Sequence, residues 1–263
     1  MSETQAKRKL PDWAKDPFLK SLGYQRQLND FYGLSLLGLQ AIFETHQEVE
    51  ELAAELQKLE QETGVGREVE GLDPKFRVTV RERAQLASRE IKQGFPVLNA
   101  QATISIWASL EWLVRDLIVG LVANDPSSRR NDTVRKVRIR LSDYEELAGN
   151  EKYYYVVDQI ERDLGASLKV GVDRFESLLA VFGLSGPVDK GVKATLFELS
   201  QIRNVLVHRG GVAGTRITQA LPSRQLKLGE RVVVGIKDYV RYMNAALDYE
   251  NTLLGRLQAW MSK

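Results

Sequence analysis

An arginine, an asparagine and a histidine lie near the end of one apolar, helix-like run, and their side chains suit acid–base chemistry. The stretch QIRNVLVHRGG, residues 201–211, holds Arg203, Asn204 and His208 and closes on two glycines. An imidazole is the side chain that changes charge near neutral pH, and the only other histidine of the chain is His46. The stretch is therefore either a functional site or the charged end of a core helix.

Arg203 is predicted to face the interior of the protein. The spacing of apolar residues predicts a helix over 190–208. Steps of four, three, four and three residues bring one set of side chains to a single face of it: Val192, Leu196, Leu199, Arg203 and Leu206. A guanidinium on that face keeps its charge, so it requires an anionic partner or a wet cleft.

A second predicted helix, over 98–123, carries the complementary charge. The same spacing places one carboxylate on its apolar face, which consists of Trp107, Glu111, Val114, Ile118 and Leu121. Arg115, four residues further on, is one candidate partner for Glu111. Arg203 is the other candidate, and a pair between Glu111 and Arg203 would be a buried ion pair.

His208 does not share the face of Arg203. Five residues at about 100° each place it about 140° around the helix. Gly210 and Gly211 end the helix, and the carbonyls of a last turn favour an imidazolium by about 0.3–1 kcal/mol. From spacing alone, three structural roles stay open beside catalysis: Arg203 as an ion-pair partner, His208 as a helix-cap residue and Asn204 as a polar surface residue.

The composition removes several classes of site. The chain has 263 residues, of which 43% are hydrophobic and 27% charged, and a net charge of +2. It contains no cysteine, which excludes disulfides, thiolate nucleophiles and cysteine-ligated metals. With only two histidines, we expect no metal site and no cofactor.

The sequence shows no targeting or membrane segment. Residues 1–20 contain no apolar run that resembles a signal peptide. The longest apolar stretch, at 117–123, is far shorter than the ~20 residues of a membrane span. We therefore expect a cytoplasmic protein with no membrane partner.

The chain is predicted to be all-α. Beyond the two helices above, helical patterns cover 34–63, 78–93 and 234–261. Residues 1–20 are expected to form a partly ordered arm, and 209–231, rich in Gly, Thr, Arg and Val, a loop or small hairpin before the C-terminal helix. The fold class is a helical bundle with an N-terminal helical extension and this small insertion.

The helix predicted over 34–63 is strongly charged towards its end. Leu52, Leu56 and Leu59 are spaced for one face, and glycines at 64 and 66 stop it. The simpler interpretation is an amphipathic helix on the surface of the core. The alternative is a helix that pairs with a partner chain.

The motif region resembles the HEPN superfamily. RNVLVH at 203–208 is similar to its R-x(4–6)-H motif, in which a polar residue follows the arginine. ISIWASLEWLVRDLI at 104–118 resembles its other signature helix, which carries a glutamate, and RFESLLAVFGL at 174–184 resembles the segment before the motif helix. The resemblance covers roughly 90–255. It divides the chain into an N-terminal arm and charged helix, 1–75, and a HEPN-like helical domain, 76–263.

The resemblance implies a metal-independent endoribonuclease. HEPN domains are helical bundles that usually dimerise, with the motif arginine and histidine of both protomers in one cleft. Arg203 would bind and polarise the scissile phosphate, His208 would act on the 2′-hydroxyl or the leaving oxygen, and Asn204 would orient the pair, with Glu111 on the signature helix. The expected partners are RNA, a second copy of the chain, and an antitoxin or defence-system protein if the chain is a toxin or antiphage effector.

A basic segment is expected to bind the RNA backbone. SSRRNDTVRKVRIRL, residues 127–141, has six basic residues and a single acid, and phosphate contacts by such side chains are independent of sequence. The candidate RNA-binding residues are Arg129, Arg130, Arg135, Lys136, Arg138, Arg140 and, beside the motif, Arg209. Arg216 and Arg224 are further candidates for the cleft. The alternative is a solvated charged loop.

Two other functions stay open. In the first, the chain keeps the HEPN fold as a non-catalytic nucleotide- or partner-binding module, in which Arg203 and Glu111 form a structural pair. In the second, it is a purely structural helical protein, a monomer with Arg203 fully paired inside the bundle.

Overall fold

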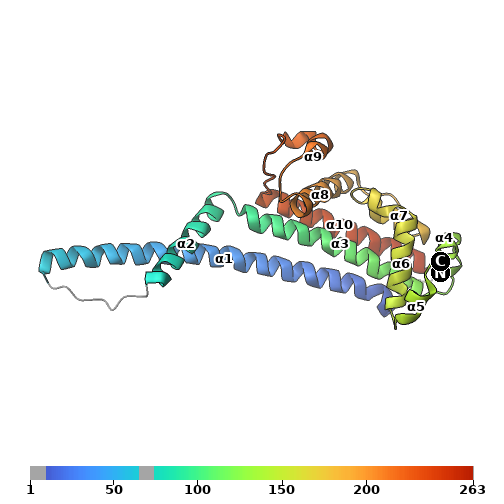
Figure 1. The fold of residues 1–263 in the computed structure, drawn as a ribbon. Coiled ribbons are helices and arrows are strands. Elements are labelled where there is room, and N and C mark those ends of the chain that lie inside the picture. The colour runs from blue at the N-terminus through green and yellow to red at the C-terminus, as the bar shows by residue number, and fades with distance from the viewer. Residues whose placement is uncertain (1–9, 65–73, 263) are drawn as a thin grey trace, which may run out of the picture.

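The chain folds into an array of helices in which four long ones lie side by side. A computed structural model describes residues 10–64 and 74–262. Figure 1 shows α1, α3, α8 and α10 along the length of the bundle, with α4 to α7 gathered at the end that holds the C-terminus. The helices are α1 (Asp12–Thr63), α2 (Pro74–Lys92), α3 (Pro96–Asn124), α4 (Asp132–Lys136), α5 (Leu141–Glu146), α6 (Glu151–Asp163), α7 (Asp173–Val181), α8 (Lys190–His208), α9 (Thr215–Ala220) and α10 (Ile236–Met261), with short 3-10 turns η1 (Ser128–Arg130), η2 (Ala166–Leu168) and η3 (Pro222–Arg224).

The all-α class is confirmed. No strand occurs in residues 10–64 and 74–262, and the one β-type contact is an isolated antiparallel bridge between Val212 and Arg231. The predicted helix over 190–208 has the bounds of α8, and those over 98–123 and 234–261 agree with α3 and α10 within two residues at each end. Within the described ranges, no helix combines the length and the hydropathy that a membrane crossing requires.

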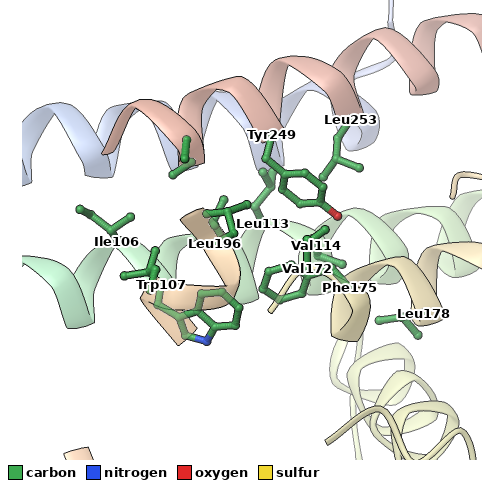
Figure 2. Close-up of a cluster of buried hydrophobic side chains, with 14 of the residues drawn as sticks. Ile106, Trp107, Leu113, Val114, Val172, Phe175, Leu178, Leu196, Tyr249 and Leu253 are labelled. Atoms are coloured by element: carbon green, nitrogen blue, oxygen red, sulfur yellow. The ribbon is translucent and has the colours of Figure 1, made fainter. Parts of the chain in front are cut away.

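Helix α3 forms the centre of the core because it is apolar on nearly every side. Its buried residues contact side chains from α7, α8 and α10, as the close-up in Figure 2 shows. The rings of Trp107 and Phe175 stack at 5.0 Å between centroids, and Phe175 lies 6.0 Å from the ring of Tyr249. Burial of such large side chains stabilises by roughly 1.5–3 kcal/mol each, so this cluster fixes α7 and α8 against α3.

The N-terminal arm is helical where it is described, which corrects the prediction for residues 12–20. Ala14 and Phe18 are buried in the common core. Pro17 lies inside α1 and removes the hydrogen bond that the Trp13 carbonyl would accept. That carbonyl instead faces Gly120 of α3, where an added Cβ would lie 2.9 Å from it. The proline therefore does not break the helix, because tertiary packing accommodates it. Residues 1–9 lie outside the described part.

The N-terminal half of α1 belongs to the bundle. Its Ser21 and Gln25 side chains donate hydrogen bonds to the buried carboxylate of Glu250 on α10, at 2.7 and 2.5 Å. Gln25 also donates to Ser109 of α3 at 3.1 Å. One core therefore contains residues from both sides of the predicted division at residue 75.

The insertion after α8 differs in part from the predicted loop or hairpin. Its two arms do approach each other as in a hairpin: Ala213 N–H donates to the Glu230 carbonyl at 2.8 Å, and Val232 N–H to the Gly211 carbonyl at 2.8 Å. Between the arms the chain forms the helix α9 instead of a turn. Burial of Ile217 under this helix explains the difference, because one apolar side chain anchors α9 to the core.

Candidate functional site

Helix α8 begins and ends with local signals that place the motif at its last two turns. The Asp189 side chain caps its start by accepting from the backbone of Gly191 and Val192 at 2.8 and 3.1 Å. At the other end, Gly210 and Gly211 both adopt positive φ, and Gly211 N–H donates to the Val205 carbonyl. His208 is therefore the final helical residue, as the glycines predict.

Arg203 faces inward, as the spacing predicts, and meets Glu111, which is one of the two pairings that the spacing left open. Its Nη2 lies 3.7 Å from Glu111 Oε2, and Arg174 of α7 binds the other carboxylate oxygen more closely. Arg115, the alternative partner for Glu111, instead pairs with Asp158 of α6. One carboxylate thus serves two guanidinium groups, so Glu111 neutralises only part of their charge.

The guanidinium of Arg203 is fixed but not saturated. Its Nη1 donates to Asn204 Oδ1 at 3.3 Å, while its Nε is buried without a hydrogen-bond partner within the described residues. The side chain is 22% exposed. Glu111 and Asn204 therefore leave part of the hydrogen-bonding capacity of Arg203 unfilled, which is costly for a buried donor.

A hollow of about 430 Å³ opens beside the other face of α8. Steps of three and four residues bring Gln201, Asn204 and His208 to this face. The lining residues are Lys169, Val170, Gln201, Asn204, Val205, His208, Arg209, Gly214, Arg216 and Ile217. None of them is acidic, and three are cationic at neutral pH, which makes the hollow suited to an anionic group.

Two close backbone contacts shape the walls of the hollow. Gly171, at φ +58°, lies against α8, where an added Cβ would be 2.9 Å from the Cα of Phe197, and its N–H donates to Ser200 Oγ at 3.1 Å. This contact carries Lys169 to one wall. On the other wall the Arg209 guanidinium lies over Gly214, so close that a Cβ there would overlap it.

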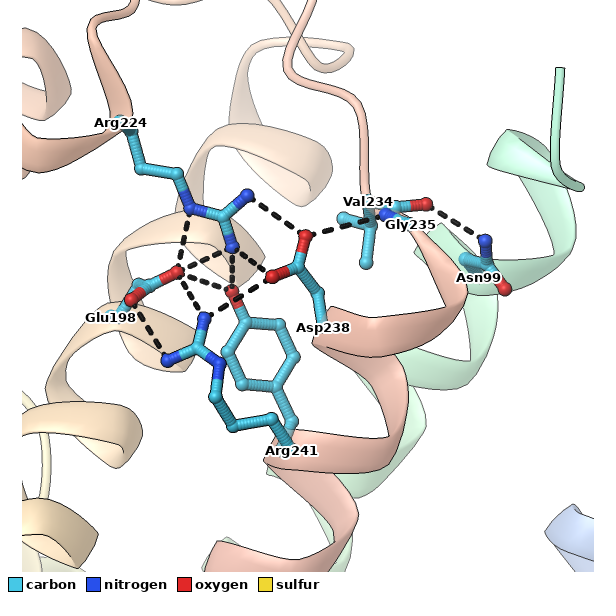
Figure 3. A network of polar contacts seen from close by, with 8 residues as sticks. Asn99, Glu198, Arg224, Val234, Gly235, Asp238 and Arg241 are labelled. Carbon is cyan, nitrogen blue, oxygen red and sulfur yellow. Dashed lines mark hydrogen bonds and ion pairs between the residues drawn. The ribbon is translucent and has the colours of Figure 1, made fainter.

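An ion-pair network holds the insertion, and with it α9, over the end of α8. Figure 3 shows Arg224 between Glu198 of α8 and Asp238 of α10. Arg224 donates to Glu198 at 2.7 Å, to Asp238 at 2.8 Å and to the Tyr242 hydroxyl at 2.8 Å. Arg241 completes the network at 2.7 Å from Glu198. Arg224 is therefore occupied in positioning the insertion.

The network also fixes the charge states of its members. Burial alone would raise the pKa of Glu198, but hydrogen bonds from Arg241, Arg224 and Tyr242 outweigh it and lower that pKa. Burial likewise opposes the charge on Arg224, while bonds to Asp238 and Glu198 raise its pKa. Both groups are thus held ionised, so the wall that they support does not change charge near neutral pH.

The predicted basic segment lies away from the hollow. Figure 1 shows α4 and α5 at the end of the bundle next to the C-terminus, whereas α9 lies along the bundle towards its other end. Arg129 caps α3 by donating to the Val122 and Ala123 carbonyls, and its guanidinium lies 5.7 Å over the ring of Tyr153. Five other basic residues are exposed there: Arg130, Arg135, Lys136, Arg138 and Arg140.

The structure thus joins some predicted site residues and separates others. Glu111, Arg203 and Asn204 form one chain of contacts, and Asn204, His208 and Arg209 line the hollow. Sequence reasoning missed Arg174 as the second partner of Glu111, although Arg174 opens the RFESLL segment before the motif helix. It also missed Lys169 and Gln201, because loop residues and interior glutamines carry no periodic signal.

The described residues contain no group of three His, Cys, Asp or Glu side chains placed to hold a metal ion.

Comparison with protein-family models, with curated proteins and with solved structures gives no match. The HEPN resemblance of residues 90–255 therefore stays a prediction, and the local geometry carries the functional argument.

Proposed function

We propose that the chain is a metal-independent endoribonuclease of HEPN type, which acts as a dimer through Arg203, Asn204 and His208. In this proposal it serves as a toxin or as an effector of antiphage defence. The observation that carries the proposal is the position of Asn204. Its side chain accepts a hydrogen bond from Arg203 and also lines the acid-free hollow that His208 lines.

The residue types fit the cleavage of RNA. The 2′-hydroxyl of RNA is the nucleophile, so the reaction requires no metal-activated water. His208 removes the proton from that hydroxyl or returns one to the leaving 5′-oxygen. Arg203 stabilises the charge that develops on the phosphate, and Lys169, Arg209 and Arg216 bind neighbouring phosphates.

Dimerisation belongs to the proposal because the reaction has two proton transfers. One chain supplies a single histidine at the hollow, and that histidine is exposed at the end of α8. Two copies facing each other across a two-fold axis supply two imidazoles, one for each transfer.

The substrate side of the proposal is tested with a matched pair of oligonucleotides. After the cleavage position in an RNA has been mapped, a second RNA carries a single 2′-deoxy nucleotide at that position. In EDTA, we expect the wild-type chain to cut the first RNA, leaving a 2′,3′-cyclic phosphate, and to leave the second intact. Cleavage of the 2′-deoxy oligonucleotide, or an activity that EDTA removes, would contradict the mechanism.

A second candidate is a nucleotide-binding module without catalysis. The pair of Arg203 with Glu111 favours it, because a guanidinium held at 3.7 Å from a carboxylate on the inner face is partly withdrawn from ligands. The two candidates differ in the role of His208. In a binding module, His208→Ala leaves the affinity for RNA or nucleotides nearly unchanged, and no cleavage accompanies binding. Lys169→Ala and Arg216→Ala weaken binding whether the chain is a nuclease or a binding module.

A further inference from the structure

The far part of α1 exposes a row of large apolar side chains. Phe31, Leu34, Ile42, Val49, Leu52 and Leu59 are all exposed. Their separations of three, eight, seven, three and seven residues are all sums of the three- and four-residue steps that keep one side of a helix. These six residues are named the apolar row. The side chain of Leu56, predicted on the same face, lies outside the described part.

The apolar row lies on the side of α1 that α2 does not cover. Helix α2 packs where Phe43 and His46 of α1 meet Ala84 and Ser88. At about 100° per residue, Phe43 points about 150° and His46 about 90° away from the mean direction of the row. Figure 1 shows that the end of α1 extends well past α2 and the bundle. The row is therefore not part of the interface between the two helices.

One flank of the apolar row is strongly acidic. Residues 44–62 contain seven glutamates and one lysine, although the whole chain has a net charge of +2. Five of these glutamates follow one another at helical steps along the same side of the row, namely Glu44, Glu48, Glu51, Glu55 and Glu62. All five are exposed. A helix that covers the row would lie beside this acidic flank.

The acidic flank disfavours a second copy of the chain as the occupant. In an antiparallel pair, Glu48 and Glu55 of one copy would face the same glutamates of the other copy. In a parallel pair they would face residues 46, 53, 57 and 60, which include no lysine or arginine. Like charges destabilise the antiparallel arrangement, and the parallel arrangement offers the glutamates no cation, so the complementary surface belongs to a different, basic protein.

We propose that the apolar row binds an amphipathic α-helix of another protein, whose own apolar seam is flanked by lysine or arginine. From Phe31 to Leu59 the row spans 28 residues, about 42 Å of helix at 1.5 Å per residue. That length corresponds to four heptads, enough to specify a coiled-coil pair. The apolar contacts supply affinity, and the glutamates select the charge of the partner.

The proposal is tested with the full chain and two synthetic helical peptides of four heptads. Both peptides carry leucine and isoleucine at the seam; one has lysine and the other glutamate at the flanking positions. We expect the lysine peptide to bind at least about tenfold more tightly than the glutamate peptide, and its affinity to fall as salt rises. Equal binding of both peptides, or of neither, would overturn the proposal.

Variants of the chain locate the binding surface. The double variant Val49→Gln and Leu52→Gln should weaken the lysine peptide about tenfold or more. Ala54→Gln, an exposed change of similar kind on the opposite side of α1, should leave binding unchanged. Equal binding by the two variants would place the contact elsewhere and would overturn the proposal.

Sedimentation of the same variants tests the alternative occupant. If the wild type is a dimer and the change of Val49 and Leu52 abolishes it, a second copy occupies the row and the proposal is overturned. RNA cleavage is not a readout here, so failure of this test leaves the proposed ribonuclease site unaffected.

Discussion

Asn204 connects the two parts of the candidate site at the scale of single residues. Arg203 and His208 lie on different faces of α8, and no described hydrogen bond joins their side chains directly. Asn204 accepts from Arg203 at 3.3 Å and borders the hollow beside His208. The Asn204 amide is therefore the group that connects the Arg203 guanidinium to the hollow.

Substitution of Arg203 separates its structural role from its chemical role. Arg203→Lys keeps a positive charge opposite Glu111, and Arg174 continues to hold that carboxylate. We therefore expect the free energy of unfolding to change by less than about 1 kcal/mol. A lysine cannot bond Asn204 and a phosphate together as a planar fork does, so cleavage should fall about 100-fold. Thermal unfolding and RNA cleavage are measured on the same sample of the variant. A large loss of stability with cleavage retained would contradict this prediction.

Spacing was sufficient to predict part of this site. The apolar face of α8 places Arg203 inward, and that of α3 places Glu111 opposite it, because a 3.6-residue period reports which side chains face the core. Arg174 is 63 residues from Glu111, and their contact depends on how α7 packs, which no local pattern encodes. Lys169 and Arg216, which line the hollow, come from outside α8. The hollow therefore could not be predicted from the pattern of that helix alone.

At the scale of elements, packing decides where local signals conflict. Pro11 and Pro17 favour an irregular start, yet α1 begins at Asp12 because Phe18 and Ala14 are buried against the bundle. The insertion after α8 contains turn-forming residues, yet Ile217 anchors the short helix α9. In both segments burial of apolar side chains outweighs the local preference, which is about 1 kcal/mol against a glycine and about 3 kcal/mol against a proline inside a helix.

The insertion should loosen when its central arginine is removed. Arg224→Ala leaves Glu198 and Asp238 with Arg241 as their remaining cation, so we expect a loss of about 1–3 kcal/mol of unfolding free energy. Because α9 forms a wall of the hollow, affinity for RNA should fall as well. Lys227→Ala, an exposed change in the same insertion, is the control and should alter neither quantity in chemical denaturation and binding assays.

The buried carboxyl of Glu250 should make stability depend on pH. Burial raises its pKa, and the hydrogen bonds from Ser21 and Gln25 offset this only in part. Oε2 of Glu250 and Oε1 of Gln25 are buried acceptors without a hydrogen-bond partner in the described part. The folded pKa exceeds the unfolded one, so this contribution is full below the unfolded pKa, about 4.3, and is lost as pH rises through the folded pKa.

Glu250→Gln isolates that contribution. The amide is neutral and of nearly the same shape, so relative to the wild type its stability should improve by about 1–2 kcal/mol between pH 4.5 and pH 7.5. Denaturant unfolding of both proteins at the two pH values measures the difference. A difference that stays constant, or one that moves in the wild type's favour as pH rises, would contradict a raised pKa of Glu250.

At the scale of the whole molecule, charge is divided among three regions. The hollow at the end of α8 is cationic, the exposed basic segment lies near the C-terminal end of the bundle, and the far part of α1 is acidic. A net charge of +2 conceals this division. The two proposals therefore place RNA and a basic protein helix at different parts of the molecule, where they would not compete.

The basic segment should contribute to affinity and not to chemistry. Neutralising Arg135, Lys136, Arg138 and Arg140 to glutamine should weaken binding of long RNA. It should also reduce the dependence of log K on log salt by about 0.7 for each phosphate that the variant no longer neutralises. Binding titrations over a range of salt and single-turnover cleavage measure the two effects. A changed cleavage rate at saturating enzyme would mean that the segment acts in the chemical step.

The measurement that tests the central claim most directly is the rate of RNA cleavage in EDTA by the wild type, His208→Ala and His46→Ala. His46 is the matched control, because it is the only other histidine and lies on α1 beside Glu50, at 3.9 Å. With equal thermal stability verified for all three, we predict that His208→Ala lowers the rate at least about 100-fold and that His46→Ala leaves it unchanged. Equal cleavage by the wild type and His208→Ala, or no cleavage by the wild type across varied RNAs, would contradict the account.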